Sequence, residues 1–207
     1  MPADTLTAQP GNALGTGSLR DPEVRKTLAL LGAFCMFLST IEFMIPKPMP
    51  FMRLGIANLP LMLALDILSF PKFLVLIGIK VLGQALITGT LFSYIFLFSL
   101  AGTALAGISM YALRRALGGK VSFIGVGTLG AMMSNISQMA LAWLFIFGNA
   151  VRFIAPPFFA AGLITGVALG IFCEIFARRS SWYAARRVRN FGPVIEAKDA
   201  AQNGAPA

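Results

Sequence analysis

The chain has 207 residues, of which 57% are hydrophobic and 12% are charged, and its mean hydropathy is +0.78. This composition is typical of proteins solvated by lipid and excludes most classes of soluble enzyme. The net charge is +9 and histidine is absent, which excludes histidine-based acid–base catalysis and the usual nitrogen ligands of zinc.

Apolar stretches separated by Lys, Arg, Pro or Gly predict an all-α membrane domain over residues 23–190. Residues 1–22 are rich in Gly and Pro and predict a disordered cytoplasmic lead, and residues 191–207 predict a flexible cytoplasmic tail. We expect a bundle of six transmembrane helices, with spans near 27–45, 54–70, 73–89, 91–113, 123–147 and 156–177. The second and third are short, so whether both cross the bilayer fully stays open.

Six spans would divide Lys and Arg unevenly between the two sides of the membrane. One side would hold Arg20, Arg25, Lys26, Lys72, Arg114, Arg115, Lys120, Arg178, Arg179, Arg186, Arg187 and Arg189, and the other only Lys47, Arg53 and Arg152. Because cytoplasmic segments carry the excess of Lys and Arg, this bias predicts a multi-pass protein of the bacterial inner membrane with both termini in the cytoplasm. The basic charge is a topology signal, and we expect membrane lipids rather than nucleic acid as the contact.

The first expected span carries a face of small residues near its cytoplasmic end, formed by Ala29, Gly32 and Ala33. Small residues let a second helix approach closely, so this face predicts either packing inside the bundle or docking of a partner subunit. The last span has Gly162, Gly166 and Gly170 at intervals of four, which favours packing inside the bundle.

Asp66 and Lys80 are charged residues inside the second and third expected spans. A charged side chain near the centre of a span costs about 2.5 to 3.5 kcal/mol and therefore needs a partner. We expect a structural ion pair between the two, with a proton or ion relay as the alternative.

Four amide side chains lie in the outer half or near the middle of three spans: Asn58, Gln84, Asn135 and Gln138. Either they bond neighbouring helices, or they line a shared cavity open to the outside. Charged and polar residues would surround its mouth: Glu42, Lys47, Arg53, Asn149 and Arg152. This set favours a substrate site for an anionic or partly anionic ligand, covered by the stiff, proline-rich stretch 46–53.

Two patterns that would indicate chemistry are excluded. Gly125–Gly130 matches the glycine pattern of dinucleotide-binding proteins, but it begins a membrane span instead of following a strand, so its glycines are expected to be packing positions. Outside the lead, the acidic residues do not cluster as a Mg²⁺ site requires. We therefore expect no catalytic residue, no metal and no cofactor, and a protein that is not an enzyme.

The segment Pro48–Leu61 runs from a proline-rich connection into Leu-Gly-Ile-Ala-Asn. It resembles the Gx transporter family, whose members are often labelled heptaprenyl diphosphate synthase component I, over roughly residues 27–178. That family is similar to the substrate-binding S components of energy-coupling factor transporters. The resemblance implies a six-helix fold, a loop over the ligand, and docking of a transmembrane coupling subunit on an Ala-x-x-x-Ala face, which Ala29 and Ala33 match.

These observations predict a membrane-embedded subunit that binds a small organic, vitamin-like solute from outside. The chain has no Walker motif, so ATPases and a coupling subunit are the expected partners. Two alternatives stay open: a non-catalytic membrane partner of a prenyl diphosphate synthase, and a secondary transporter coupled to ions through Asp66, Lys80 or Glu42. The identity of the solute does not follow from the sequence.

Overall fold

The computed structural model describes residues 21–46, 55–117, 120–184 and 186. Within these ranges the chain is helical and forms no strand. Its helices are α1 (Pro22–Met44), a 3-10 turn (Ile56–Asn58), α2 (Leu59–Ala64), α3 (Phe70–Ile87), α4 (Tyr94–Leu117), α5 (Phe123–Ala142), a π-helical turn (Trp143–Phe147), a 3-10 turn (Gly148–Ala150) and α6 (Val151–Arg179). The predicted lead, apart from Asp21 and Pro22, and the predicted tail lie outside the described residues.

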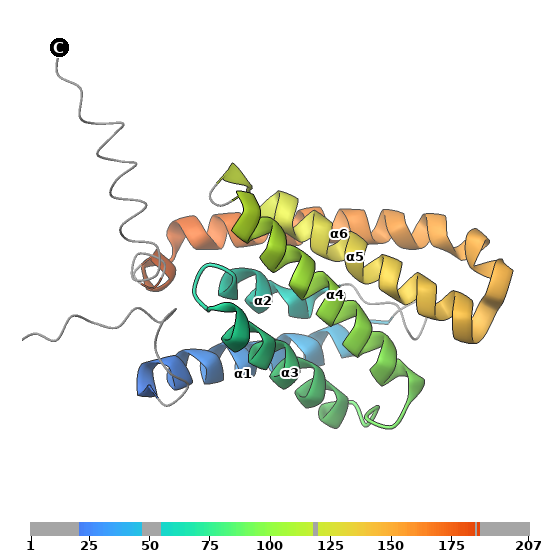
Figure 1. Cartoon of the computed structure of the whole chain (residues 1–207), viewed down its shortest axis with the longest axis horizontal. Coiled ribbons are helices and arrows are strands. Elements are labelled where there is room, and N and C mark those ends of the chain that lie inside the picture. The colour runs from blue at the N-terminus through green and yellow to red at the C-terminus, as the bar shows by residue number, and fades with distance from the viewer. Residues whose placement is uncertain (1–20, 47–54, 118–119, 185, 187–207) are drawn as a thin grey trace, which may run out of the picture.

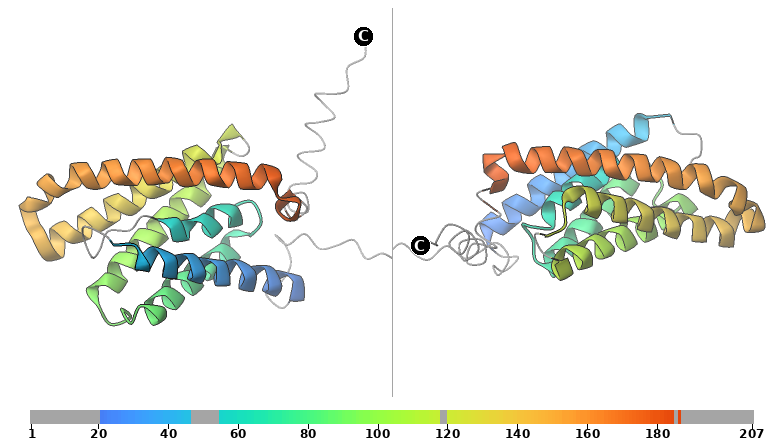
Figure 2. Two further views of the ribbon diagram at one scale, coloured as in Figure 1. Left: turned by 180° about the vertical axis from the view of Figure 1, so that it is seen from behind. Right: turned by 90° about the horizontal axis from the view of Figure 1, so that it is seen from above.

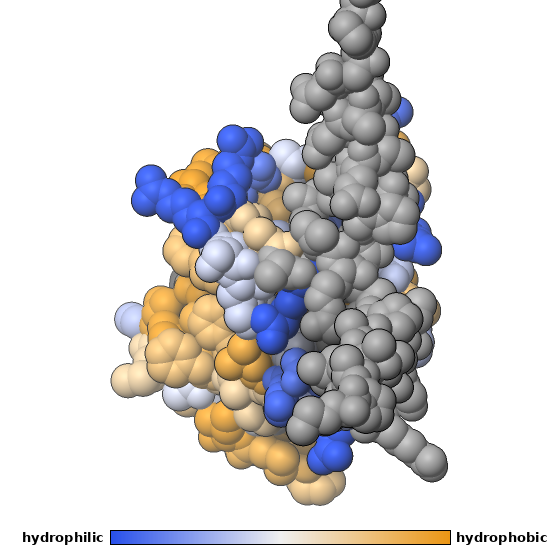
Figure 3. Space-filling view, turned by 90° about the vertical axis from the view of Figure 1, so that its left-hand side faces the viewer, coloured by the Kyte–Doolittle hydropathy of each residue, from blue (hydrophilic) through white to orange (hydrophobic). Residues whose placement is uncertain are grey.

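The helices alternate in direction. Helices α1, α3 and α5 run one way, while α2, α4 and α6 run back, as Figure 1 shows. Helices α1 and α3 begin, and α4 and α6 end, at the left of Figure 1, so the described basic residues at those helix ends gather on one end of the bundle. Figure 3 shows this end of the bundle, where hydrophilic residues lie next to a hydrophobic surface. Arg152, at the start of α6, lies at the opposite end.

Four continuous helical stretches in the described part are long and apolar enough to cross a membrane: Pro22–Met44, Phe70–Ile87, Tyr94–Leu117 and Phe123–Arg179. The fourth contains the whole α5–α6 hairpin, which extends beyond the other helices in Figures 1 and 2. Large apolar side chains are exposed along these helices, among them Leu30, Phe37, Leu82, Leu100 and Ile164. In water such a surface would aggregate, so the chain is an integral membrane protein.

The prediction that residues 54–70 form one long helix is wrong. Helix α2 has six residues, Leu59–Ala64, and is about 9 Å long, far short of a bilayer core of about 30 Å. Residues 59–68 are all buried, because α1, α3, α4, α5 and α6 pack around them. Hydropathy alone does not distinguish a lipid-facing helix from a helix buried in protein, which explains the error. Helices α1 and α3 run in the same direction, so the chain must go back from the end of α1 to the start of α3. Helix α2 forms part of this return.

Glycines bring α5 and α6 into backbone contact. A Cβ atom at Gly127 would lie 2.7 Å from the carbonyl oxygen of Gly166, and one at Gly170 would lie 2.8 Å from that of Phe123. A Cβ at Gly130 would lie 2.5 Å from the sulfur of Met110 on α4. The expectation that these glycines serve packing is confirmed for Gly127 and Gly130 and for the last-span glycines, whereas Gly125 is exposed; α5 runs through the whole motif as a helix.

The small-residue face of α1 is only partly as expected. Ala29 and Ala33 are exposed on the outside of the bundle. Gly32 is buried instead, and a Cβ atom there would lie 3.0 Å from Cγ2 of Ile79 on α3. The assignment of Gly32 to a docking surface is therefore corrected, because Gly32 lets α1 approach α3; docking at Ala29 and Ala33 stays a prediction.

Candidate functional site

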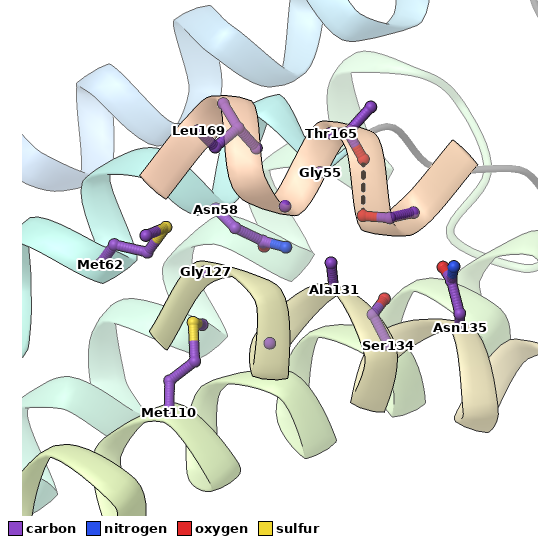
Figure 4. A pocket seen from close by; sticks show the side chains of 13 residues that line it. Gly55, Asn58, Met62, Met110, Gly127, Ala131, Ser134, Asn135, Thr165 and Leu169 are labelled. Atoms are coloured by element: carbon purple, nitrogen blue, oxygen red, sulfur yellow. Dashed lines mark hydrogen bonds between the residues drawn. The ribbon is translucent and has the colours of Figure 1, made fainter. Parts of the chain in front are cut away.

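A small cavity, whose mainly apolar lining includes four polar side chains, lies between the α2 segment, α5 and α6, near the middle of α5 (Figure 4). Its volume is about 20 Å³, which is enough for about one water molecule. A site for a drug-sized solute needs about 300 Å³ or more, so an organic solute would enter only if the helices move apart. The cavity is lined by Gly55, Asn58, Met62, Met110, Gly127, Gly130, Ala131, Ser134, Asn135, Gly162, Thr165, Gly166 and Leu169.

Asn58 joins this cavity to a buried cation. The Nζ atom of Lys80 donates a hydrogen bond to Oδ1 of Asn58 and another, of 3.5 Å, to Oγ1 of Thr103. Lys80 is 2% exposed and comes from the middle of α3. A lysine ammonium can only donate, so it holds the amide of Asn58 with its oxygen toward α3. The amide nitrogen of Asn58 is then directed toward the cavity, as Figure 4 shows.

Asn135 and Ser134 supply the polar wall on α5. Nδ2 of Asn135 donates a 3.1 Å hydrogen bond to the carbonyl oxygen of Phe158 on α6, and Gln138, which is 0% exposed, donates from Nε2 to Oγ of Ser134 at 2.8 Å. Two of the four expected amides, Asn58 and Asn135, thus line one cavity, and Gln138 lies one hydrogen bond behind it. This arrangement fixes the direction of the wall's donors and acceptors.

Glu42 holds the backbone at the edge of the cavity. It is 2% exposed, and its two carboxylate oxygens accept hydrogen bonds from the backbone N–H groups of Gly55, at 3.2 Å, and Ala57, at 3.1 Å. Gly55 has φ +80°, a conformation that L side chains rarely adopt, so glycine is required there. The sequence predicts Glu42 at the mouth of the cavity, whereas in the structure Glu42 is buried and bonds the backbone of the segment that positions Asn58.

The remaining expected site residues are not brought to the cavity. Gln84 is buried in α3 away from its lining. Asn149 and Arg152 are exposed near the tip of the α5–α6 hairpin. Lys47 and Arg53 lie outside the described residues, and so does most of the proline-rich stretch expected to cover the ligand.

The predicted ion pair between Asp66 and Lys80 is corrected, because the structure gives the two residues different partners. Arg114 on α4 forms a bidentate pair with Asp66, with Nε to Oδ1 at 2.8 Å and Nη2 to Oδ2 at 2.6 Å. The hydroxyl of Tyr183 also donates to Oδ2 of Asp66, at 2.9 Å. Helix α2 ends at Ala64, so Asp66 lies in the turn before α3. Lys80 lies within α3, about 15 Å along the helix from its first residue, Phe70.

Sequence reasoning missed several polar residues. Ser134 precedes Gln138 by one helical turn and Thr165 follows Gly162 by three residues, so helix periodicity was a signal that could have placed both on the cavity-facing sides of α5 and α6. Arg114 was counted only as a cytoplasmic charge. Tyr183, which is 0% exposed, had no sequence signal for burial, because it lies in a short helical turn after α6.

Comparison with known proteins gives one result. Neither a curated protein nor a solved structure matches the chain. A family model described as heptaprenyl diphosphate synthase component I matches residues 31–176, which include α2 to α5 and most of α1 and α6. The match covers more than two thirds of the 207 residues and contains the whole cavity lining. The chain therefore belongs to the heptaprenyl diphosphate synthase component I family.

Proposed function

We propose that the protein is a membrane-embedded solute-binding subunit of an energy-coupling factor type importer, which captures a small organic solute from outside. The observation that carries the proposal is the convergence of Asn58, Ser134, Asn135 and Thr165 from three segments on one cavity inside a lipid-exposed bundle. Polar groups are expensive within a membrane and tend to mark the path or site of a solute. The described conformation is nearly closed, so binding requires a more open state.

The first test is whether the protein retains a solute. Protein extracted in mild detergent should release a small organic molecule on denaturation, detected by mass spectrometry. Thr165→Val removes a hydroxyl from the cavity wall, which should lower the affinity for that molecule about 2- to 12-fold, the effect of one hydrogen bond. Thr40→Val is the matched control, because both hydroxyls donate to the carbonyl four residues earlier in their own helix. Equal occupancy in both variants, or no solute in the wild type, would contradict the proposal.

The second test addresses the energy source. Ala29 and Ala33 lie exposed on one side of α1, where a coupling subunit would dock. Replacing both by Leu should abolish uptake in cells that contain the coupling subunit and ATPases, while the purified variant retains its solute. Ala168→Leu, at an exposed position of α6, is the control and should leave uptake unchanged. Full uptake by the double variant would rule out docking at this face, and uptake by the purified chain in liposomes with an ion gradient would favour a secondary transporter.

A second candidate function is favoured by the family's description, which names a component of a prenyl diphosphate synthase. In that case the protein would be a non-catalytic membrane anchor for a soluble prenyl synthase. Co-purification of such an enzyme with the tagged protein, together with loss of its membrane association when this chain is deleted, would support the anchor. An unchanged distribution of the synthase would contradict it.

A further inference from the structure

We infer that the cavity binds a neutral group of the solute that carries a hydrogen-bond donor and an acceptor side by side, an open-chain amide or a lactam. The oxygen of this group would accept from Asn58, and its N–H would donate to Asn135 and Thr165. This inference rests on the proposed binding role and adds to it the chemical class of the group that is recognised and the atoms that contact it.

The donor of the cavity wall is the amide nitrogen of Asn58. The ammonium of Lys80 has N–H groups to donate and no lone pair, so its hydrogen bond to Asn58 is received by the amide oxygen, Oδ1. Nδ2 of Asn58 points into the cavity in Figure 4, and no acceptor in the described part of the chain bonds to it. The two N–H groups of this amide are therefore available to an oxygen of the solute.

The acceptors of the wall come from Asn135 and Thr165. Nδ2 of Asn135 donates to the carbonyl oxygen of Phe158, which can only accept, so Oδ1 is the atom of this amide that is left for a solute. Asn135 is 3% exposed, and within the described ranges no donor bonds to its Oδ1. The hydroxyl of Thr165 gives its one hydrogen to the carbonyl oxygen of Ala161 or Gly162, so it offers lone pairs to the cavity that it lines.

A wall with a donor on one side and acceptors on the other selects a group that has both. A carboxylate offers only lone pairs and would place an oxygen against the acceptors of Asn135 and Thr165, whereas an ammonium offers only donors and would face Nδ2 of Asn58. Either mismatch leaves a buried polar group unpaired, which costs more than one hydrogen bond contributes. An amide or lactam has its C=O beside its N–H and can pair with both sides. The hydroxyl of Ser134 also lines the cavity and can serve as donor or acceptor.

The cavity in the described conformation has room for about one water, so an amide enters as the helices separate. Each asparagine is fixed within one part of the bundle, because Asn58 is bonded to α3 and Asn135 joins α5 to α6. Movement of the α5–α6 hairpin away from the α2 segment therefore enlarges the cavity while both amides keep their orientation. The side chains of Met62 and Met110 line the cavity, and their flexibility lets them repack around a solute.

The test uses small probes that differ in their hydrogen-bond pattern. Acetamide and the lactam pyrrolidinone carry a donor and an acceptor, acetate carries only acceptors, and methylammonium only donors. Saturation-transfer NMR of the purified protein in detergent, with protein-free micelles as the blank, measures the binding of each probe at constant ionic strength.

Acetamide or pyrrolidinone should bind saturably and about tenfold or more tightly than acetate and methylammonium. The tighter of the two amides distinguishes an open-chain amide site from a lactam site. Binding of acetate or methylammonium as tight as that of the amides would overturn the inference. Absence of saturable binding by either amide would show that the cavity holds only water, and would also overturn it.

Asn58→Asp exchanges the N–H donors of the wall for an oxygen at nearly constant size, while Lys80 still finds an acceptor. The affinity for the amide probe should fall about tenfold. Asn149→Asp introduces the same charge at an exposed position near the hairpin tip, and it should leave probe binding unchanged. Unchanged affinity in Asn58→Asp, or an equal loss in both variants, would contradict the assignment of Asn58 as the contact.

A second variant tests the acceptor side independently of Asn58. Thr165→Val removes an acceptor and keeps the shape of the side chain, so the affinity for acetamide should fall about 2- to 12-fold, while that for acetate should not fall. Thr40→Val, which removes a hydroxyl with the same bond within its own helix, should change neither affinity. A parallel loss for acetamide and acetate in Thr165→Val would show that the site does not recognise the N–H of an amide.

The binding role and this inference fail separately. If the wild type retains a solute that has neither an amide nor a lactam, the binding role stands and the inference is wrong. If acetamide binds and Asn58→Asp abolishes its binding, but no solute is retained or imported, the amide site stands and the importer role is wrong.

Discussion

Replacing Arg114 by Met should lower the free energy of unfolding by about 3 to 5 kcal/mol, the usual cost of removing one partner from a buried ion pair. Arg114 is 9% exposed and Asp66 is 3% exposed, so the carboxylate would stay buried without its guanidinium. Arg114 also donates to the carbonyl oxygen of Val121 and stacks 4.8 Å from the ring centre of Phe123. The variant therefore loosens the junction between α4, α5 and the turn before α3. Denaturation of the purified protein, followed by loss of helical circular dichroism, measures the effect.

Two controls separate this effect from a general change in charge. Arg178→Met removes the cation of an ion pair with Glu174, in which the side chain of Arg178 is 77% exposed and that of Glu174 is 28% exposed. This variant should lower the free energy of unfolding by about 1 kcal/mol or less. Combining Asp66→Asn with Arg114→Met removes both buried charges and should recover much of the loss. An equal loss in Arg178→Met and Arg114→Met, or no recovery in the double variant, would show that the buried pair does not hold this end of the bundle together.

Gly170→Ala should destabilise the α5–α6 hairpin by about 1 to 3 kcal/mol, because the added methyl group meets backbone atoms rather than a flexible side chain. Its Cβ would lie 2.8 Å from the carbonyl oxygen of Phe123 and 3.0 Å from the amide nitrogen of Ile124. Helix α6 would have to move away from α5, which also changes the wall of the cavity. Thermal unfolding in detergent measures the loss, and binding of the retained solute should weaken in parallel.

Gly78→Ala is the matched control, since it makes the same change in α3 at a glycine whose added Cβ meets nothing within 4 Å. There the substitution should leave stability unchanged or raise it by up to about 1 kcal/mol, because alanine favours a helix more than glycine does. Opposite signs for the two variants would support close backbone packing as the role of Gly170. Equal stabilisation by both would exclude it.

Much of the architecture could be predicted from the sequence. The long helices α1, α3, α4, α5 and α6 fall close to the expected spans, because a lipid-exposed helix must be apolar along most of its length. The glycine spacing on α6 predicted close packing, since small residues at intervals of four lie on one side of a helix. These signals are local, and the bilayer imposes them on each helix separately.

The partners of the polar residues could not be predicted in the same way. The sequence placed Asp66 and Lys80 in neighbouring spans, but the end of α2 at Ala64 put Asp66 in a turn, within reach of Arg114 and Tyr183. Lys80 instead bonds to Asn58, which is 22 positions away along the chain. Residue number gives the depth of a side chain along a span only while the helix continues, and α2 ends early.

By itself, the sequence determined that this is a helical membrane protein with its basic residues gathered toward one end, because composition and charge are read one segment at a time. Only the tertiary structure decided that α2 is a short helix enclosed by the others, that Asn58 and Asn135 share a cavity, and that Glu42 fastens the backbone beside it. The physical reason is that hydrogen bonds within a bundle join residues far apart in the chain, and their geometry depends on how the helices pack.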